Sequence, residues 1–168
     1  LEDYEERLGP LYLGSAAPGV IELGDVPLYD EATLAGDPAI DPTDFDLENG
    51  ARIRGTTAEW VSDDEILLTI YWQADGAIDA DYSTAVHLLA HDPPTGPADI
   101  LSQADHVHPV DGWYPTTRWR PGAIGRDAYL LAVPSGSAPV GIRVAMYRND
   151  PAAGFVNTPW LSIPLPPR

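Results

Sequence analysis

Proline and glycine are spread along the whole chain, and this distribution limits what the chain can fold into. The 168 residues include 18 prolines and 15 glycines, placed between short apolar runs and not gathered in one tract. A proline inside a helix removes a hydrogen bond and clashes with the preceding turn, at a cost of about 3 kcal/mol. Long helices are therefore disfavoured, and short strands joined by frequent turns are favoured.

The runs between these turns have the composition of β-strands. They are rich in β-branched and aromatic residues, and three of them alternate apolar side chains over Ile66–Trp72, Tyr129–Val133 and Ile142–Met146, which predicts one buried face for each. On the run with Ile142, the alternate face with Arg143, Ala145 and Tyr147 is expected to be wet. Strands are predicted at 51–60, 65–74, 82–90, 99–107, 127–134, 141–148 and 160–165.

Seven such strands without an intervening helical pattern predict an all-β fold. We expect a two-sheet antiparallel β-sandwich, of the jelly-roll or immunoglobulin-like kind, over residues 44–168. Residues 1–43 are predicted to be an irregular lead-in with one strand, which packs on the domain or links to it. The lead-in contains one or two helical turns in "LEDYEERL" and an acidic, proline-punctuated segment, "GDPAIDPTDFD".

Charge and composition narrow the classes of partner. The formal net charge is −17, and all nine basic residues are arginine, so nucleic acid and anionic membrane surfaces are not expected as partners. Cysteine is absent, which removes disulfides and thiolate chemistry. No apolar run approaches the roughly 20 residues of a membrane span, so we expect no direct membrane insertion of this segment. Because the sequence begins at Leu1, we expect a processed form or a piece of a longer protein.

The order of several short motifs resembles that of a known kind of domain. The motifs are Tyr71-Trp72, Asp81-Tyr82, His87-Leu88, Gln103 with Asp105, Gly112, Pro115-Thr116, Trp119 with Pro121-Gly122, Asp127 with Tyr129, Gly141, and Met146-Tyr147. In this order they resemble the β-sandwich domain at the extracytoplasmic C-terminus of bacterial membrane proteins of the glycosyltransferase type that use lipid-linked sugars. The resemblance covers about residues 44–166, and "HDPPTGPADI" departs from it by inserting a proline-rich loop.

This resemblance implies a function without catalysis. It implies a non-catalytic accessory module on the outer side of a membrane, near an enzyme whose catalytic machinery lies elsewhere. We expect such a module to bind carbohydrate or to contact a neighbouring domain. No catalytic residues come with it. The expected localisation is therefore extracytoplasmic, and the expected partners are a glycan or an adjacent membrane-protein domain.

Two histidines at alternate positions suggest a different class of function. On a strand, His106 and His108 project to the same face and can share one metal ion, with Asp105, Asp111 or His87 as a third ligand. Such a site would make the protein a metal-dependent enzyme of the cupin-like type. The alternative is that the histidines lie solvated at a strand edge before Pro109, and that His87 is a hydrogen-bonded residue of the sheet.

The segment that follows gathers aromatic and charged side chains in one loop. An exposed indole at Trp113, with Tyr114 beside it, can stack on a sugar ring while Asp111, Arg118 and Arg120 hydrogen-bond its hydroxyl groups; these five are the candidate ligand-binding residues. Trp119 is expected to pack instead and to close one end of the sandwich, with Arg118 or Arg120 stacked on an indole. Trp113 and Tyr114 are open to either role.

The remaining acidic residues have structural interpretations. Carboxylates in "DPTDFDLENG" and "DGAIDADYS" are ligands of the type that a structural calcium ion uses, but hydrated acidic turns explain them equally well. We expect no other cofactor. Asp127 is expected to accept hydrogen bonds from Arg118, from Arg120 or from backbone amides of the loop before it.

Overall fold

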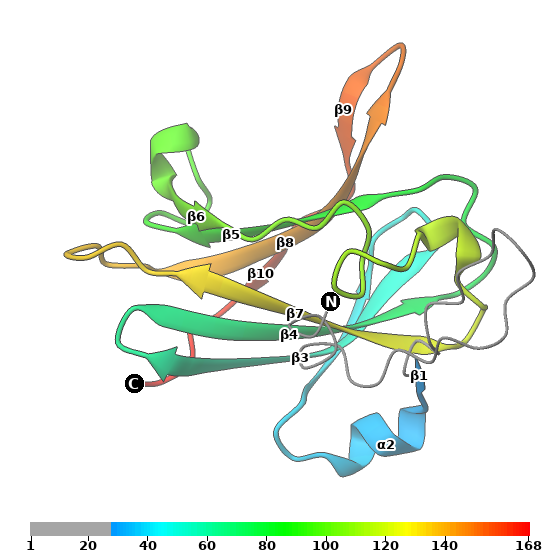
Figure 1. Ribbon diagram of the computed structural model, residues 1–168, viewed down its shortest axis with the longest axis horizontal. Coiled ribbons are helices and arrows are strands. Elements are labelled where there is room, and N and C mark those ends of the chain that lie inside the picture. The colour runs from blue at the N-terminus through cyan, green and yellow to red at the C-terminus, as the bar shows by residue number, and fades with distance from the viewer. Residues whose placement is uncertain (1–27) are drawn as a thin grey trace, which may run out of the picture.

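The computed structural model describes residues 28–168, which form two antiparallel β-sheets packed face to face (Figure 1). Sheet A has the order β1-β7-β4-β3-β2 and consists of β1 (Leu28–Tyr29), β2 (Asp41–Asp46), β3 (Ala51–Ser62), β4 (Glu65–Ala74) and β7 (Ile124–Ala132). Sheet B has the order β10-β8-β5-β6 and consists of β5 (Ser83–Leu89), β6 (Ile100–Gln103), β8 (Gly141–Asp150) and β10 (Leu161–Ile163), with β9 (Gly154–Asn157) also paired to β8. This arrangement confirms the predicted two-sheet β-sandwich.

The predicted strands agree with the structure where the sequence alternates. Each of the seven predicted segments overlaps one strand, namely β3, β4, β5, β6, β7, β8 and β10. Three short strands lie outside these segments: β1, β2 and β9. One strand was expected in residues 1–43, without bounds, and the structure has β1 and the start of β2 there. β2 has the acidic, proline-containing composition of a loop, and it forms a strand because it lies at the sheet edge and pairs only with β3.

The described part of the predicted lead-in belongs to sheet A. β1 pairs with β7, and the predicted boundary before residue 44 falls inside β2. Between them lies α2 (Glu31–Gly36), a short helix that was not predicted. Asp30 caps it by accepting a hydrogen bond from the amide of Thr33 at 2.7 Å. The helical turns predicted in residues 1–8 lie outside the described residues.

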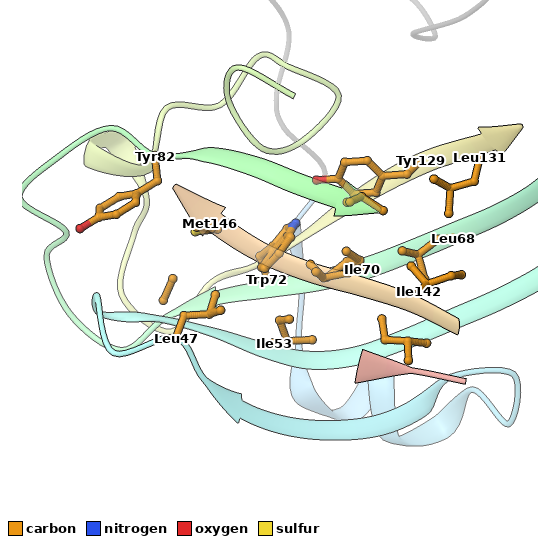
Figure 2. Packing of buried hydrophobic residues seen from close by; sticks show 14 of the residues in the cluster. Leu47, Ile53, Leu68, Ile70, Trp72, Tyr82, Tyr129, Leu131, Ile142 and Met146 are labelled. Carbon is orange, nitrogen blue, oxygen red and sulfur yellow. The ribbon is translucent and has the colours of Figure 1, made fainter. Parts of the chain in front are cut away.

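The core lies between the two sheets and contains the predicted apolar faces (Figure 2). Ile66, Leu68, Ile70 and Trp72 of β4 are completely buried. Their partners from the facing sheet and from β7 are buried as well: Tyr129, Leu131, Val133, Ile142, Val144 and Met146.

The outer face of β8 is less exposed to solvent than the sequence suggests. Arg143 and Tyr147 keep partial exposure there, but Ala145 is completely buried. The guanidinium of Arg143 lies over the ring of Trp160, 5.4 Å from its centre, and the ring of His87 lies 5.0 Å from the same indole. Large side chains therefore spread over part of a face that was expected to be wet.

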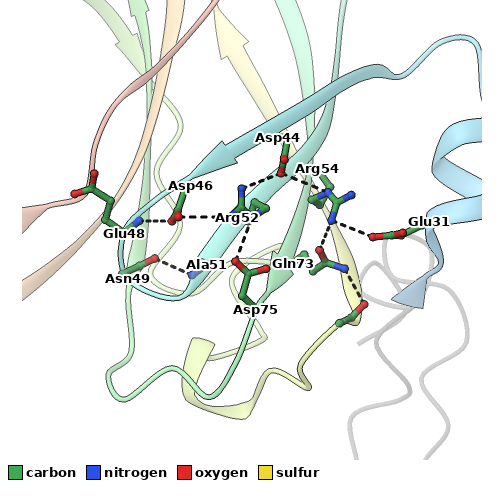
Figure 3. A network of polar contacts seen from close by, with 11 residues as sticks. Glu31, Asp44, Asp46, Glu48, Asn49, Ala51, Arg52, Arg54, Gln73 and Asp75 are labelled. Atoms are coloured by element: carbon green, nitrogen blue, oxygen red, sulfur yellow. Dashed lines mark hydrogen bonds and ion pairs between the residues drawn. The ribbon is translucent and has the colours of Figure 1, made fainter.

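The edge of sheet A carries a network of ion pairs (Figure 3). Arg52 on β3 bonds the carboxylates of Asp44 at 2.9 Å, Asp75 at 3.1 Å and Asp46 at 3.4 Å. Arg54 pairs with Glu31 of α2 at 3.0 Å, which joins the helix to the sheet.

Within residues 28–168, no helix is long and apolar enough to cross a membrane.

Candidate functional site

The connection between β6 and β7, residues 104–123, holds most of the predicted site residues. It first continues along β5, where the Ala104 amide donates to the Val86 carbonyl and the Thr84 amide to the His106 carbonyl. It returns to sheet A where the Gly122 amide donates to the Ala74 carbonyl at 2.8 Å. The connection therefore spans from sheet B to sheet A at the end of the sandwich where β4 ends and β7 begins (Figure 1).

A tight turn in this connection has an unusual backbone. Three successive residues, Val110, Asp111 and Gly112, have positive φ angles of 58°, 54° and 85°. Glycine adopts this region freely, but a β-branched valine does so at a cost of about 1–3 kcal/mol. The turn persists because surrounding contacts fix it, and the isopropyl group of Val110 is buried.

The main contact that fixes the turn is a buried carboxylate. Asp127 on β7 is completely buried, and its Oδ1 accepts the backbone N–H of Asp111 at 2.9 Å. The same oxygen bonds Nδ1 of His106 at 3.1 Å, while Oδ2 accepts Nε1 of Trp72 at 3.2 Å and the hydroxyl of Tyr129. Four hydrogen-bond donors on one carboxylate offset the cost of burying it inside the core.

The network continues from Asp127 into sheet B. The hydroxyl of Tyr129 is also 2.9 Å from that of Thr84, and the amide of His106 donates to the same threonine oxygen at 3.2 Å. The rings of His106 and Tyr129 are stacked with centres 4.4 Å apart. Hydrogen bonds and ring stacking thus join β4, β5, β7 and the loop in one polar cluster.

Charge and burial in this cluster shift the pKa values of its titratable side chains. Burial by itself lowers the pKa of the His106 imidazole, but the hydrogen bond and the negative charge of Asp127 outweigh it, so the pKa is raised. Burial and the charge of Asp127 also raise the pKa of Asp111. Burial raises the pKa of the Tyr129 phenol well above its usual range, so this hydroxyl stays protonated.

The predicted acceptor role of Asp127 is confirmed for the loop amide and is wrong for the arginines. Neither Arg118 nor Arg120 contacts it among the described residues; the donors are the side chains given above and one amide. Trp72 and Thr84 were missed as members of the cluster. An acidic residue in phase with Tyr129 and Leu131 on one strand was the signal that a carboxylate enters the core.

The predicted metal ligands are divided among different contacts. Nδ1 of His106 is bonded to Asp127, and Asp105 accepts the Val86 amide at 2.9 Å. His87 is hydrogen-bonded to Gln103 at 2.7 Å, in line with its predicted place in the sheet. Nδ1 of His108 is buried and has no hydrogen-bond partner among residues 28–168.

The arrangement of these side chains therefore gives little support to a metal site. The part of the chain that the structure describes holds no group of three or more histidine, aspartate or glutamate side chains arranged for a metal ion. In the acidic segments proposed for calcium, Asp44 and Asp46 are paired with Arg52, and Asp81 accepts the amide and hydroxyl of Thr117 at 3.1 and 2.7 Å.

The predicted ligand-binding residues lie together in the same connection, with different exposures. Trp119 is 8% exposed and packs in the core, as predicted, and its Nε1 donates to the Tyr114 carbonyl at 3.1 Å. Tyr114 is half-buried beside it, with the two rings 6.3 Å apart. Trp113 is 46% exposed, and Asp111, Arg118 and Arg120 are exposed.

Among residues 28–168, neither Arg118 nor Arg120 stacks on an indole, contrary to the prediction for this loop. The arginines that lie over aromatic rings within residues 28–168 are Arg143, Arg148 and Arg168, and none belongs to the loop. Arg118 and Arg120 are exposed instead, and they flank the buried Trp119 in the sequence. The arrangement can offer an aromatic surface, two cationic groups and one carboxylate to a ligand.

The chain matches no protein-family model, no curated protein and no solved structure.

Proposed function

We propose that the chain is a non-catalytic accessory module that acts outside the cytoplasm and binds carbohydrate on the loop of residues 109–122. The observation that carries the proposal is the 46% exposure of Trp113 on a loop whose backbone is anchored to the buried carboxylate of Asp127. An exposed indole offers a flat apolar face to a sugar ring. Because the loop is fixed before the ligand arrives, little conformational entropy is lost on binding.

Polar groups for sugar hydroxyls lie close in sequence on the same loop. Asp111 supplies acceptor oxygens, and Arg118 and Arg120 supply exposed donors. The short helix η2 (Thr116–Arg118) and the bond from the Tyr114 hydroxyl to the Arg118 carbonyl, 2.9 Å long, fix the backbone between them. Stacking with flanking hydrogen bonds is the usual physical basis for holding a sugar.

The resemblance of residues 44–166 to extracytoplasmic domains of glycosyltransferase-like membrane proteins supports the proposed location. It also supports an adjacent domain of a membrane protein as the second partner. The proposal includes no cofactor and no catalytic step.

Affinity electrophoresis through gels that contain single polysaccharides tests the proposal, because it needs no tryptophan signal. Retardation of the wild-type protein by at least one polysaccharide, lost in Trp113→Ala, is the expected result. Phe155→Ala is the matched control, since Phe155 is a 72% exposed aromatic residue on β9, outside the loop. The control should be retarded like the wild type.

Two outcomes would contradict carbohydrate binding at this loop. One is the absence of retardation by any polysaccharide in a broad panel. The other is retardation that Trp113→Ala leaves unchanged. Either outcome would favour contact with a neighbouring domain as the function of the module.

A further inference from the structure

The loop has a charge pattern opposite to that of the whole chain. From Trp113 to Arg126 the sequence contains three arginines and no aspartate or glutamate, while the complete chain has a net charge of −17. The acidic residue that follows, Asp127, is completely buried, so its carboxylate does not lie on the surface. The surface contributed by this segment is therefore cationic on an otherwise acidic protein.

Two of these arginines have no partner among residues 28–168. The guanidinium groups of Arg118 and Arg120 form no ion pair within 4.0 Å, no hydrogen bond and no ring stack in that part of the chain, and both residues are exposed. The other described arginines each have a side-chain contact: Arg52, Arg54, Arg126, Arg143, Arg148 and Arg168.

The carboxylate that influences Arg118 is already occupied. Burial raises the pKa of Asp81, but the hydrogen bonds from Thr117 outweigh it, and the charges of His108 and Arg118 lower this pKa further. The Asp81 Oδ1 atom nevertheless accepts both bonds from Thr117 and forms no ion pair with Arg118. The chain has 26 acidic and nine basic residues. Two exposed arginines that flank one tryptophan and form no ion pair among residues 28–168 are therefore an exception to the general pattern.

Resting on the proposed carbohydrate site, we infer that the ligand of this loop is an acidic saccharide. The sugar ring stacks on Trp113, and its carboxylate or sulfate group pairs with Arg118 and Arg120. A guanidinium binds either anion through two parallel charge-assisted hydrogen bonds, which a neutral hydroxyl group cannot match.

The net negative charge of the chain opposes this binding only weakly at short range. At physiological ionic strength the Debye length is about 8 Å, so distant carboxylates are largely screened from a ligand on the loop. Arg118 and Arg120 would contact the anion directly, where screening is small. Asp111 is the acidic residue of the loop itself, and its raised pKa reduces its repulsion at mildly acidic pH.

Titration of intrinsic tryptophan fluorescence with three polymers tests this inference: polygalacturonate, which carries carboxylates, dextran sulfate, and neutral dextran. The wild type should bind at least one acidic polymer about tenfold more tightly than dextran. Arg118→Gln and Arg120→Gln should each weaken that binding about tenfold. Comparison of the two acidic polymers shows which anion the loop prefers.

Arg168→Gln is the control for nonspecific attraction, because it removes the same charge from an exposed arginine. Arg168 lies over Trp60, beside the turn between β3 and β4, whereas the loop meets sheet A at Ala74, the other end of β4. This variant should bind like the wild type. Equal weakening in Arg168→Gln and Arg118→Gln would overturn the inference, because the polymer would then respond to net charge alone.

The result also separates this inference from the proposed function. Binding of neutral polysaccharide that needs Trp113 but is unchanged in Arg118→Gln and Arg120→Gln would overturn the acidic ligand and leave carbohydrate binding intact. No binding of any acidic or neutral polymer would overturn both.

Discussion

The indole nitrogen of Trp72 donates a hydrogen bond to Oδ2 of Asp127 across 3.2 Å, and both side chains are completely buried. The two residues lie on neighbouring strands of sheet A. The indole of Trp72 points into the core between the sheets (Figure 2). The other oxygen of the same carboxylate holds the loop that carries Trp113. The core and the proposed ligand surface are thus joined through one side chain.

Replacement of Asp127 by asparagine should destabilise the whole domain. The amide nitrogen would face donors that now meet a carboxylate oxygen, and the charge that balances His106 would be lost. Breaking a buried pair of this type costs about 3 kcal/mol or more. Urea unfolding of Asp127→Asn should show this loss.

Asp79→Asn is the control for that experiment, because Asp79 is exposed on the connection before β5. Its free energy of unfolding should stay within about 0.5 kcal/mol of the wild type. A similar free energy of unfolding for Asp127→Asn and the wild type would show that the buried network contributes little to stability.

His106 and His87 should make the free energy of unfolding depend on pH in opposite directions. The pKa of His106 is raised in the fold, above about 6.5, so its contribution is complete below the unfolded pKa and is lost as the pH rises through the folded value. The pKa of His87 is lowered, mainly by burial, so protonation in acid favours unfolding there. The groups that face His106 are Asp105, Asp111, Asp127 and Tyr129.

Thermal unfolding of His106→Gln and His87→Gln between pH 5 and pH 8 checks these signs. Relative to wild type, His106→Gln should be most destabilised near pH 5 and recover above pH 7. His87→Gln should gain stability relative to wild type as the pH falls. Parallel profiles for the two variants would contradict the opposite pKa shifts.

The two tryptophans of the loop should differ strongly in their effect on stability. Trp119 is 8% exposed and fills the core, so Trp119→Ala should cost about 3 kcal/mol or more through lost packing. Trp113→Ala, at a position 46% exposed, should cost less than about 1 kcal/mol. Chemical denaturation of both variants measures the difference, and equal losses would mean that Trp113 is a packing residue.

Removal of metal should leave the protein unchanged if it is an accessory module. The expected result is an unfolding temperature that EDTA does not alter, and less than stoichiometric zinc, iron, manganese and calcium in the purified protein. Stoichiometric metal that disappears in a variant with His106→Ala and His108→Ala would instead support the metal-dependent enzyme.

Much of the fold was predictable because it depends on local patterns. The alternation over Ile66–Trp72 and Ile142–Met146 requires one buried face whatever the partner strand, since successive side chains of a strand point to opposite sides. The positions of proline and glycine predicted where the turns lie. β2 and β9 were missed because an edge strand needs only one partner and can keep the composition of a loop.

The candidate site was predictable as a set of residues but not as an arrangement. The sequence by itself determined that the chain forms short strands and turns, and that His106, Asp111 and Trp113 lie in one stiff connection. Only the tertiary structure decided that His106 and the amide of Asp111 share the buried carboxylate of Asp127, at 3.1 and 2.9 Å. Residues 16 or more positions apart meet there through the pairing of strands from two sheets, and local sequence patterns do not encode which strands will be neighbours.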